Sequence, residues 1–101
     1  MSYPLVSVIV PTCNRDEFIE RALISIHNQT YKNIEIIVVD DGSNDHTQDV
    51  LNDYARKDSR IQCFIRPTGL SKGGNTCRNY GLKMSTGTYI QFLDSDDFLS
   101  E

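Results

Sequence analysis

Short apolar runs recur along the chain and alternate with segments that repeat an apolar residue every three or four positions. The runs lie at Leu5–Val10, Ile34–Val39, Ile61–Ile65 and Thr88–Leu93. Nearly continuous apolar runs of this length are typical of strands buried on both faces of a parallel sheet. The pattern therefore predicts four strands, the first of which is closed by Pro11.

Amphipathic helices are predicted between these strands. The first begins at Asn14, which forms a capping pattern with Glu17 three residues later, and it ends near residues 29–30. The second begins at Asp45, with Gln48 completing its cap. Apolar residues at helical spacing give this second helix one inner face, made of Val50, Leu51, Tyr54 and Ala55.

A third helix is predicted over Asn75–Ser85. One face of it carries Cys77, Tyr80 and Met84. Gly81 lies on the same face, where it lowers helix propensity but allows the backbone to approach a neighbour closely. Gly87 stands where a glycine that caps the C-terminus of this helix is expected.

The alternation of strands and helices predicts one layered unit. Repeated strand–helix–strand units give a parallel sheet with right-handed crossovers. The expected fold class is therefore α/β, three-layered, with a mainly parallel sheet. With 101 residues the chain has room for one core, and it ends shortly after the fourth predicted strand. We therefore expect residues 1–101 to be a single partial domain, the N-terminal part of a longer one.

Composition and charge exclude some classes. A net charge of −4 argues against a general nucleic-acid binder, which usually carries a basic face. No apolar run approaches the roughly 20 residues that span a bilayer, and no basic segment precedes the first run as in a signal peptide. Cys13, Cys63 and Cys77 form an odd set without metal-site spacing, so free thiols in a reducing cytoplasm are expected. His27 and His46 are expected to be solvated surface residues.

Polar loops follow the ends of the predicted strands. In open α/β sheets, ligands bind beyond the carboxyl ends of the strands, where successive loops converge. Because four polar loops share this edge, their combination is more informative than any one alone. The loops are Thr12–Arg15, Asp40–Ser43, Gly69–Asn75 and Asp94–Asp97.

The last of these loops has the form of a site for a hard cation. Asp94 and Asp96 are spaced two apart just beyond an apolar strand, and Mg²⁺ and Mn²⁺ prefer oxygen ligands. The alternative is an acidic loop in which Ser95 or Asp97 caps a following helix.

The loop after the second predicted strand permits both a binding and a structural role. Asp40 and Asp41 can accept hydrogen bonds from a base or ribose, or can belong to a tight turn in which Gly42 has unusual backbone angles. Asp40 can serve the turn while Asp41 faces a ligand.

The loop that precedes the third helix offers groups for an anion. Lys72, Gly74 and Asn75 place a positive charge and backbone N–H groups at a helix start, where a diphosphate can bind. A surface loop with an incidental lysine is the alternative. Arg78, one turn into the helix, can face the same anion or pair with an acidic loop.

Several enzyme classes lack their motifs in this sequence. No GxGxxG follows the first strand, no GxxxxGK[ST] is present, and no serine or cysteine stands in a nucleophile-elbow pattern. A dinucleotide-binding Rossmann domain, a P-loop NTPase and an acyl transferase are therefore not supported.

Taken together, these segments resemble the N-terminal half of a family 2 glycosyltransferase of the GT-A fold. The resemblance covers about Pro4 to Leu99, with the motifs in the family's order and spacing. It is carried by the segments Val6–Arg15, Ser25–Tyr31, Glu35–Ser43, Arg78–Gly81 and Gly87–Asp97.

The resemblance implies transfer of a sugar from a nucleotide-diphosphate sugar, with a UDP-sugar favoured, to a glycan or a lipid-linked sugar, usually with inversion. It implies that Asp41 contacts the base and that Asp94, Asp96 and Asp97 hold Mn²⁺ or Mg²⁺. It places further nucleotide contacts at Pro11, Thr12, Asn14, Arg15, Lys72, Gly74, Asn75 and Arg78. Cys13 stands where the family often has an aromatic residue near the base.

The carboxylate that would act as general base has no counterpart in this chain. We therefore assign no catalytic residue and expect the chain alone to bind nucleotide without transferring sugar. The expected location is the cytoplasm, or the inner face of a membrane for the full-length protein. The truncated sheet is also expected to expose an edge that favours self-association.

Two alternatives remain open from sequence. A nucleotidyltransferase shares a related sheet and metal chemistry, but it needs a glycine- and arginine-rich loop after the first strand. A receiver-like signalling module needs its acidic pair after the first strand, whereas Asp40 and Asp41 follow the second.

Overall fold

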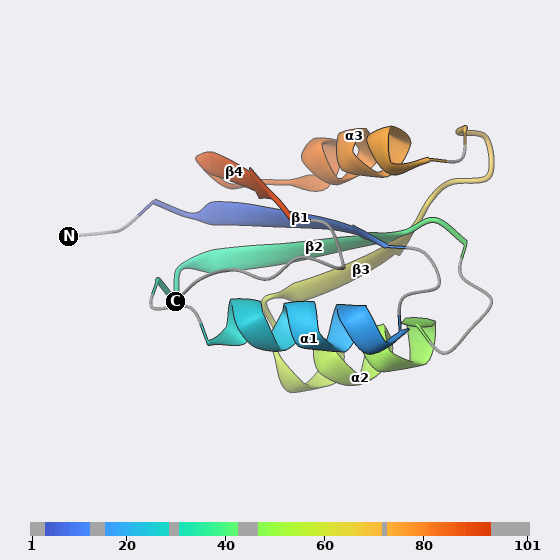
Figure 1. Cartoon of the computed structure of the whole chain (residues 1–101). Helices are drawn as coiled ribbons and strands as arrows, with labels where there is room; N and C mark the ends of the chain where they lie inside the picture. Colours follow the sequence, from blue (N-terminus) through green and yellow to red (C-terminus); the bar gives the residue numbers. More distant parts are fainter. Residues whose placement is uncertain (1–3, 13–15, 29–30, 43–46, 72, 94–101) are drawn as a thin grey trace.

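The structure, a computed structural model, describes residues 4–12, 16–28, 31–42, 47–71 and 73–93. Strands and helices alternate along this part of the chain (Figure 1). In chain order they are β1 (Val6–Thr12), α1 (Asp16–His27), β2 (Ile34–Asp40), α2 (Thr47–Lys57), β3 (Ile61–Ile65), α3 (Gly74–Met84) and β4 (Tyr89–Phe92). The predicted elements are confirmed with small shifts at their ends, while the predicted cap residues Asn14 and Asp45 lie outside the described residues.

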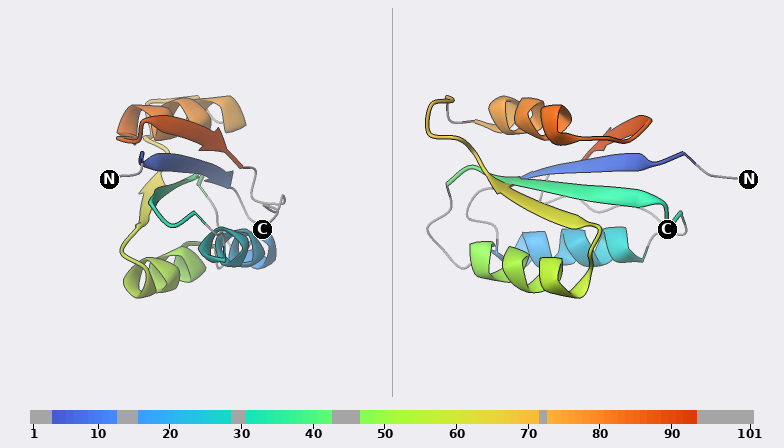
Figure 2. Two further views of the ribbon diagram at one scale, coloured as in Figure 1. Left: turned by 90° about the vertical axis from the view of Figure 1, so that its left-hand side faces the viewer. Right: turned by 180° about the vertical axis from the view of Figure 1, so that it is seen from behind.

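The four strands form one parallel sheet in the order β3-β2-β1-β4. Helices α1 and α2 cover one face of the sheet and α3 covers the other, so the predicted three-layered α/β fold is confirmed (Figure 2). β1 pairs with β2 along its whole length, from Val6↔Ile34 to Thr12↔Asp40. The carboxyl ends of β1 and β2 therefore lie side by side.

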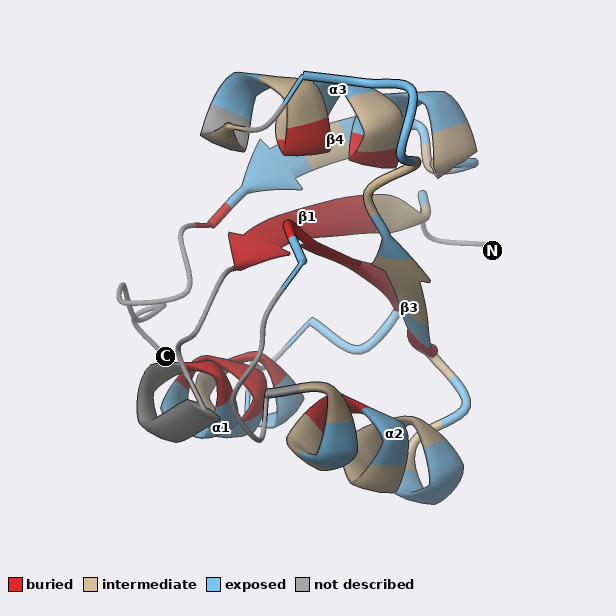
Figure 3. Cartoon of the chain, turned by 90° about the vertical axis from the view of Figure 1, so that its right-hand side faces the viewer, coloured by how far each residue is buried: buried red, intermediate tan, exposed pale blue. Residues whose placement is uncertain are grey.

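The sheet divides the core into two clusters because side chains alternate between its faces. The larger cluster packs β1 and β2 residues such as Val8 and Ile36 against α1 and α2. The smaller one packs Ile9, Ile37 and Val39 against Cys77 of α3. Figure 3 shows buried residues on the central strands and on the inner sides of the helices. The predicted inner faces of α2 and α3 are confirmed by these clusters: Val50, Leu51, Tyr54 and Ala55 in one, Cys77, Tyr80 and Met84 in the other.

β1 runs past Pro11 to Thr12, two residues beyond the predicted end. Ile9 O accepts a hydrogen bond from Leu93 N at 2.9 Å, so the backbone N–H and C=O of Ile9 point toward β4. The backbone of Pro11, two residues later, points to the same side. The pairing of β1 with β4 extends only to Ile9↔Phe92. Among the described residues no strand is paired with Pro11 on that side, so its missing N–H removes no hydrogen bond of the described ladder.

Two glycines let α3 and the following segment approach the sheet. A Cβ on Gly81 would lie 2.5 Å from Cγ2 of Ile9, which confirms the predicted close approach. The prediction that Gly87 caps α3 is wrong. The cap is Ser85, in an extended conformation that requires no left-handed residue. Gly87 instead passes against β1, where a Cβ would lie 2.9 Å from Leu5 O.

Candidate functional site

The carboxyl edge of the sheet gathers several of the predicted polar groups. Thr12 ends β1, Asp40 ends β2, and Asp41 follows directly. All three are buried, with 4%, 1% and 8% of their surfaces exposed. The start of α3 comes to the same edge, because Gly73 N–H donates to Oδ2 of Asp41 at 3.1 Å.

Asp41 is held from two sides. Nε of Arg66 donates to its Oδ1 in a salt bridge whose side chains are mostly buried, with 17% and 10% exposed. The same guanidinium donates through its NH1 to Leu70 O at 2.6 Å. A buried charge of this kind requires a partner, and the Arg66 guanidinium provides one. The arrangement therefore fixes the carboxylate of Asp41 at the edge of the site.

Arg66 was not among the predicted site residues. Its position offered a signal, because it is the first charged residue after β3, as Asp41 is among the first residues after β2. Its backbone N–H donates to Asp40 O at 2.7 Å, which carries the strand pairing one residue beyond β3. In a parallel sheet such neighbours meet at one edge, so an acid after one strand and a base after the next can pair.

Asp40 has the structural role, which is one of the two roles that the sequence permitted. Nε2 of Gln48 in α2 donates to its Oδ2 at 3.0 Å and ties the start of α2 to the end of β2. Gly42 has a φ of 88°, so the predicted unusual backbone angles are confirmed. Asp40 and Asp41 thus point to different partners, Asp40 to α2 and Asp41 to Arg66 and α3.

Thr12 carries an unsatisfied polar atom. Its backbone O accepts from Asp41 N at 2.8 Å. Its Oγ1 is buried and, within the part of the chain that the structure describes, has no hydrogen-bond partner. Buried hydroxyls in native proteins nearly always have a partner, so the partner of this hydroxyl is expected outside the described residues, in a bound ligand or in another part of the chain.

The first turn of α3 brings two predicted residues together. NH1 of Arg78 donates to Oδ1 of Asn75 at 2.9 Å, and both side chains are at least partly accessible. Gly73, which precedes the helix, has a φ of 142°, a conformation that side-chain-bearing residues rarely adopt. α3 therefore begins at this edge with a backbone that only glycine readily provides, and with its positive end toward the site.

The thiols near the site are not nucleophiles at neutral pH. Burial, together with the charge of Asp41, raises the pKa of Cys77 to about 11. Burial, together with Asp40, raises the pKa of Cys63 to about 11. Both are free, as predicted, and Cys13 lies outside the described residues. Since a thiolate is the reactive form, these residues are packing groups.

Several predicted site residues lie outside the described residues, so the structure does not place them. They are Asn14, Arg15, Lys72, Asp94, Asp96 and Asp97. Gly74 opens α3, and Pro11 is buried near the end of β1. Within the described residues no group of three or more His, Cys, Asp or Glu side chains could hold a metal ion. The predicted metal motif thus depends on the residues that follow Leu93.

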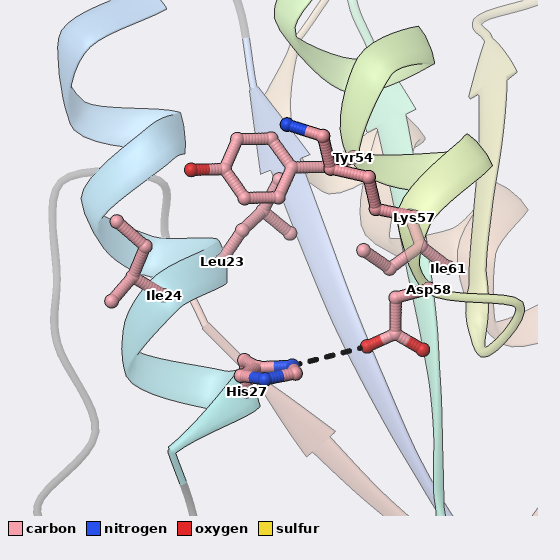
Figure 4. Close-up of a pocket in the computed structure, with 7 residues that line it drawn as sticks. All are labelled: Leu23, Ile24, His27, Tyr54, Lys57, Asp58 and Ile61. Atoms are coloured by element: carbon pink, nitrogen blue, oxygen red, sulfur yellow. Dashed lines mark hydrogen bonds and ion pairs between the residues drawn. The ribbon is translucent and has the colours of Figure 1, made fainter.

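Two hollows in the part of the chain that the structure describes adjoin the helices. One of about 150 Å³ is lined by Asp40, Gln48 and Cys63, among others, and adjoins the carboxyl edge. Figure 4 shows the other, about 260 Å³, between α1 and α2. Its walls include Leu23 and Tyr54, with the exposed His27 hydrogen-bonded to Asp58 at 3.5 Å. His27 is therefore a surface residue, as predicted, and His46 lies outside the described residues.

No helix within the described residues is both long enough and apolar enough to cross a membrane.

Comparison with protein families gives a match over nearly the whole chain. The family described as glycosyl transferase family 2 matches residues 7–101. An uncharacterized glycosyltransferase of Haemophilus influenzae is 42% identical over 100 residues, which are 99% of this chain and 39% of that protein. The UDP-Glc:alpha-D-GlcNAc-diphosphoundecaprenol beta-1,3-glucosyltransferase WfaP of Escherichia coli is 47% identical over 94 residues, 93% of this chain and 36% of that protein. The chain thus spans less than half the length of these relatives.

Solved structures share the fold at lower sequence identity. Residues 1–349 of Staphylococcus aureus TarS in complex with UDP-GlcNAc match with a TM-score of 0.80 and 35% identity, over 92% of this chain and 27% of that one. The mannosyltransferase PcManGT of Pyrobaculum calidifontis in complex with GDP-Man and Mn²⁺ matches with a TM-score of 0.80 and 30% identity, over 94% of this chain and 28% of that one.

Proposed function

This chain belongs to glycosyl transferase family 2, and from that premise we propose that it forms the donor-binding part of an enzyme that transfers a sugar from a nucleotide-diphosphate sugar to an acceptor hydroxyl. The observation that carries the proposal is the buried hydroxyl of Thr12, which has no partner among the described residues and lies beside the fixed carboxylate of Asp41. A buried polar pair of this kind, at the carboxyl edge of a parallel sheet, is suited to recognising a polar ligand.

The proposed role of Asp41 is to accept a hydrogen bond from the nucleobase. A carboxylate offers about four acceptor positions, so one already bonded by Arg66 and Gly73 can still accept from a ligand. Thr12 donates its hydroxyl to the same nucleoside, and Pro11, Asn14 and Arg15 complete this side of the site. We favour UDP as the nucleotide, in line with the uridine nucleotides that the TarS and WfaP descriptions name.

The diphosphate is proposed to lie at the start of α3. Lys72 supplies a positive charge, and the backbone around Gly74 and Asn75 supplies N–H donors at the positive end of the helix. Arg78 holds Asn75 through its NH1 and adds charge at the same place.

Asp94, Asp96 and Asp97 are proposed to hold Mn²⁺ or Mg²⁺. Three carboxylates are a donor set that such cations prefer, and they follow Leu93, whose N–H is bonded to Ile9 O at the end of β4. The Mn²⁺ in the complex of the related mannosyltransferase supports this assignment. When bound, the ion neutralises the charge of a departing nucleoside diphosphate.

We assign no general base within this chain. Residues 1–101 are proposed to be the N-terminal part of the catalytic domain, able to bind nucleotide but not to transfer sugar. For the whole enzyme we propose inversion at the anomeric carbon and an acceptor that is a glycan or a lipid-linked sugar. The undecaprenol-linked acceptor in the WfaP description supports the second class and favours action in the cytoplasm at the inner face of a membrane.

Self-association of the chain is a separate proposal that rests on the edge of the sheet. β4 is an edge strand in the described sheet, and Tyr89 and Phe92 are 60% and 48% exposed. Exposed edges with large apolar side chains favour pairing between chains. Light scattering at high concentration that shows only monomers would overturn this proposal.

Thermal unfolding with UDP, GDP and ADP, each with and without Mn²⁺, tests the donor site. A nucleotide at about 100 times its dissociation constant should stabilise the chain by roughly 2.7 kcal/mol. We expect UDP with Mn²⁺ to give the largest shift. Asp41→Asn should show a smaller shift, measured from the melting temperature of that variant without nucleotide. The absence of a shift with every nucleotide would contradict the proposed function.

A further inference from the structure

β4, the strand that precedes the acidic motif, is held weakly by its own side chains. It has four residues, it lies at the edge of the described sheet, and only Ile90 among them is partly buried. Tyr89, Gln91 and Phe92 are exposed. Register is strongly specified where one face of a strand is buried and weakly specified otherwise. The four side chains of β4 therefore do little to fix its position along β1, and the first side chain after them that is buried in the core is that of Leu93.

The segment before β4 is anchored instead at the amino edge of the sheet. Thr86 N–H donates to Oε2 of Glu35 at 2.5 Å, and its hydroxyl lies 3.1 Å from Oε1. Gly87 N–H donates to Oγ of Ser7 at 2.8 Å, and Thr88 N–H donates to Leu5 O at 2.8 Å. Three consecutive residues are thus bonded to β2, to β1 and to the residue before β1.

Glu35 is the centre of this anchor. It is a charged residue with 8% of its surface exposed, within a strand whose other residues from Ile34 to Val39 are apolar. Besides Thr86, its carboxylate accepts from Oγ of Ser7 at 2.5 Å and from Nε2 of Gln62 at 3.4 Å. It therefore joins β1, β2 and β3 to the α3–β4 connection.

The electrostatics agree with this geometry. Burial raises the pKa of Glu35, but hydrogen bonds from Ser7, Thr86 and Gly87 outweigh it and hold the pKa below its usual value. The carboxylate is therefore charged at neutral pH, and charge-assisted hydrogen bonds are roughly twice as strong as neutral ones.

The position of β4 determines where the acidic motif begins. A strand rises about 3.3 Å per residue, so a slip of one residue along β1 moves Leu93, and with it the start of the motif, by about that distance. Metal sites tolerate deviations of only about 0.2 Å in ligand distances. A small change in the anchor at the amino edge would thus be felt at the opposite end of the strand.

We propose that Glu35 is a positioning residue, which fixes β4 and Leu93 through Thr86 and Ser7 and thereby sets the point at which the acidic motif begins. The proposal rests on the function proposed above. It assigns to a residue at the far edge of the sheet an effect on metal binding without any contact to the metal or the nucleotide.

Three variants distinguish the effects of the length of the side chain at position 35, of its charge and of a general loss of stability. Glu35→Asp keeps the charge but is one methylene shorter, so it no longer spans from β2 to Thr86. Glu35→Gln keeps the length, and its amide oxygen can accept from Ser7 and Thr86 at the place of Oε2. Arg60→Met removes the partner of the mostly buried Asp58 between α2 and β3. It serves as the control for a general loss of stability, because the side chain of Arg60 bonds to Asp58 and to Lys32 O, away from α3 and β4.

Hydrogen exchange of the β4 and Leu93 amides gives the first result. In Glu35→Asp we expect these amides to exchange about tenfold faster or more while those of β2 stay protected, because local openings have their own free energies. Glu35→Gln should stay closer to the wild-type rates. Wild-type protection of β4 in Glu35→Asp would overturn the proposal, whatever the chain binds.

Titration with Mn²⁺ at saturating UDP gives the second. Changes to residues that orient metal ligands typically cost 10- to 100-fold in metal affinity. We expect a loss of about tenfold for Glu35→Asp, with UDP affinity in the absence of metal unchanged. An equal loss in Arg60→Met would overturn the positioning role. If Glu35→Asp exchanges faster than the wild type but the wild type binds no Mn²⁺, the proposed function is contradicted and Glu35 remains the anchor of β4.

Discussion

The two edges of this sheet both bury polar groups, but the groups are satisfied differently. At the amino edge Glu35, Ser7 and Thr86 satisfy one another within the chain. At the carboxyl edge Asp41 is held by Arg66, but the hydroxyl of Thr12 beside it has no partner among the described residues. A satisfied network stabilises the fold, whereas an orphaned group costs stability until a ligand pairs with it. This difference is the reason for proposing that the amino edge stabilises the fold and that the carboxyl edge binds a ligand.

The largest effect is expected for the ion pair at the carboxyl edge. Arg66→Met removes the partner of a buried carboxylate, and the loss of one partner of a buried pair typically costs about 3–5 kcal/mol. Urea unfolding measures this change. Arg56→Met is the matched control, because Arg56 is exposed and its pair with Asp53 lies on the surface, so its cost should stay within about 0.5 kcal/mol. Equal costs for the two variants would show that Asp41 does not depend on Arg66.

The next largest effect is expected from a difference in packing between the two edges. Gly87→Ala at the amino edge places a Cβ 2.8 Å from Ser7 N and 2.9 Å from Leu5 O, and we expect a loss of about 2–3 kcal/mol because backbone atoms yield little. Gly42→Ala at the carboxyl edge meets no atom within 4 Å and is opposed only by its φ of 88°, which costs roughly 1–2 kcal/mol. If thermal unfolding ranks the two in the opposite order, the amino edge is not the more tightly packed.

Much of this architecture follows from the sequence, and the exceptions have a common cause. Apolar runs and helical spacing predicted the layers, the strands and the inner faces of α2 and α3 because these patterns are local. The predicted role of Gly87 as a helix cap was wrong. The space for a side chain at Gly87 is limited by Leu5 and Ser7, which are distant in sequence. β1 was predicted to end before Pro11 because the sequence does not show that, among the described residues, β4 pairs with β1 only as far as Ile9.

The candidate site divides in the same way. Asp41 and Thr12 were found from their places after apolar strands, and the structure brings them to one edge. Arg66 was missed because its importance lies in a partner 25 residues away. Glu35 was passed over within an apolar run, although a lone charge in a buried strand signals a network that only the fold assembles.

Hydroxyl groups give a smaller but sharper contrast. Ser7→Ala removes a donor to Glu35 and an acceptor for Gly87, so it should cost about 1–3 kcal/mol. Thr12→Val removes a hydroxyl that has no partner in the described part of the chain, so stability should stay the same or rise by up to about 1 kcal/mol. Urea unfolding of the pair in the absence of nucleotide checks both signs. A clear loss of stability in Thr12→Val would mean that its hydroxyl already has a partner in the chain.

The smallest effect is expected in the dependence of stability on pH. The pKa of Glu35 is lowered in the folded chain, so its contribution is present above the unfolded pKa and is lost as the pH falls through the folded one. The pKa of Asp58 is lowered as well, by hydrogen bonds from Arg60 that outweigh burial. Unfolding free energies measured between about pH 5 and pH 3 should therefore fall less steeply in Glu35→Gln than in the wild type. Parallel curves would show that Glu35 does not contribute through its charge.

Calorimetric titration of UDP into the chain in the presence of Mn²⁺ tests the central claim, that the carboxyl edge is built to receive a nucleotide. We predict that the wild type binds and that Thr12→Val, although no less stable, binds about tenfold more weakly, a difference of roughly 1.4 kcal/mol. Arg56→Met, changed far from the edge, should bind as the wild type does. Equal affinity in Thr12→Val, or no binding by a folded wild-type chain, would contradict the account.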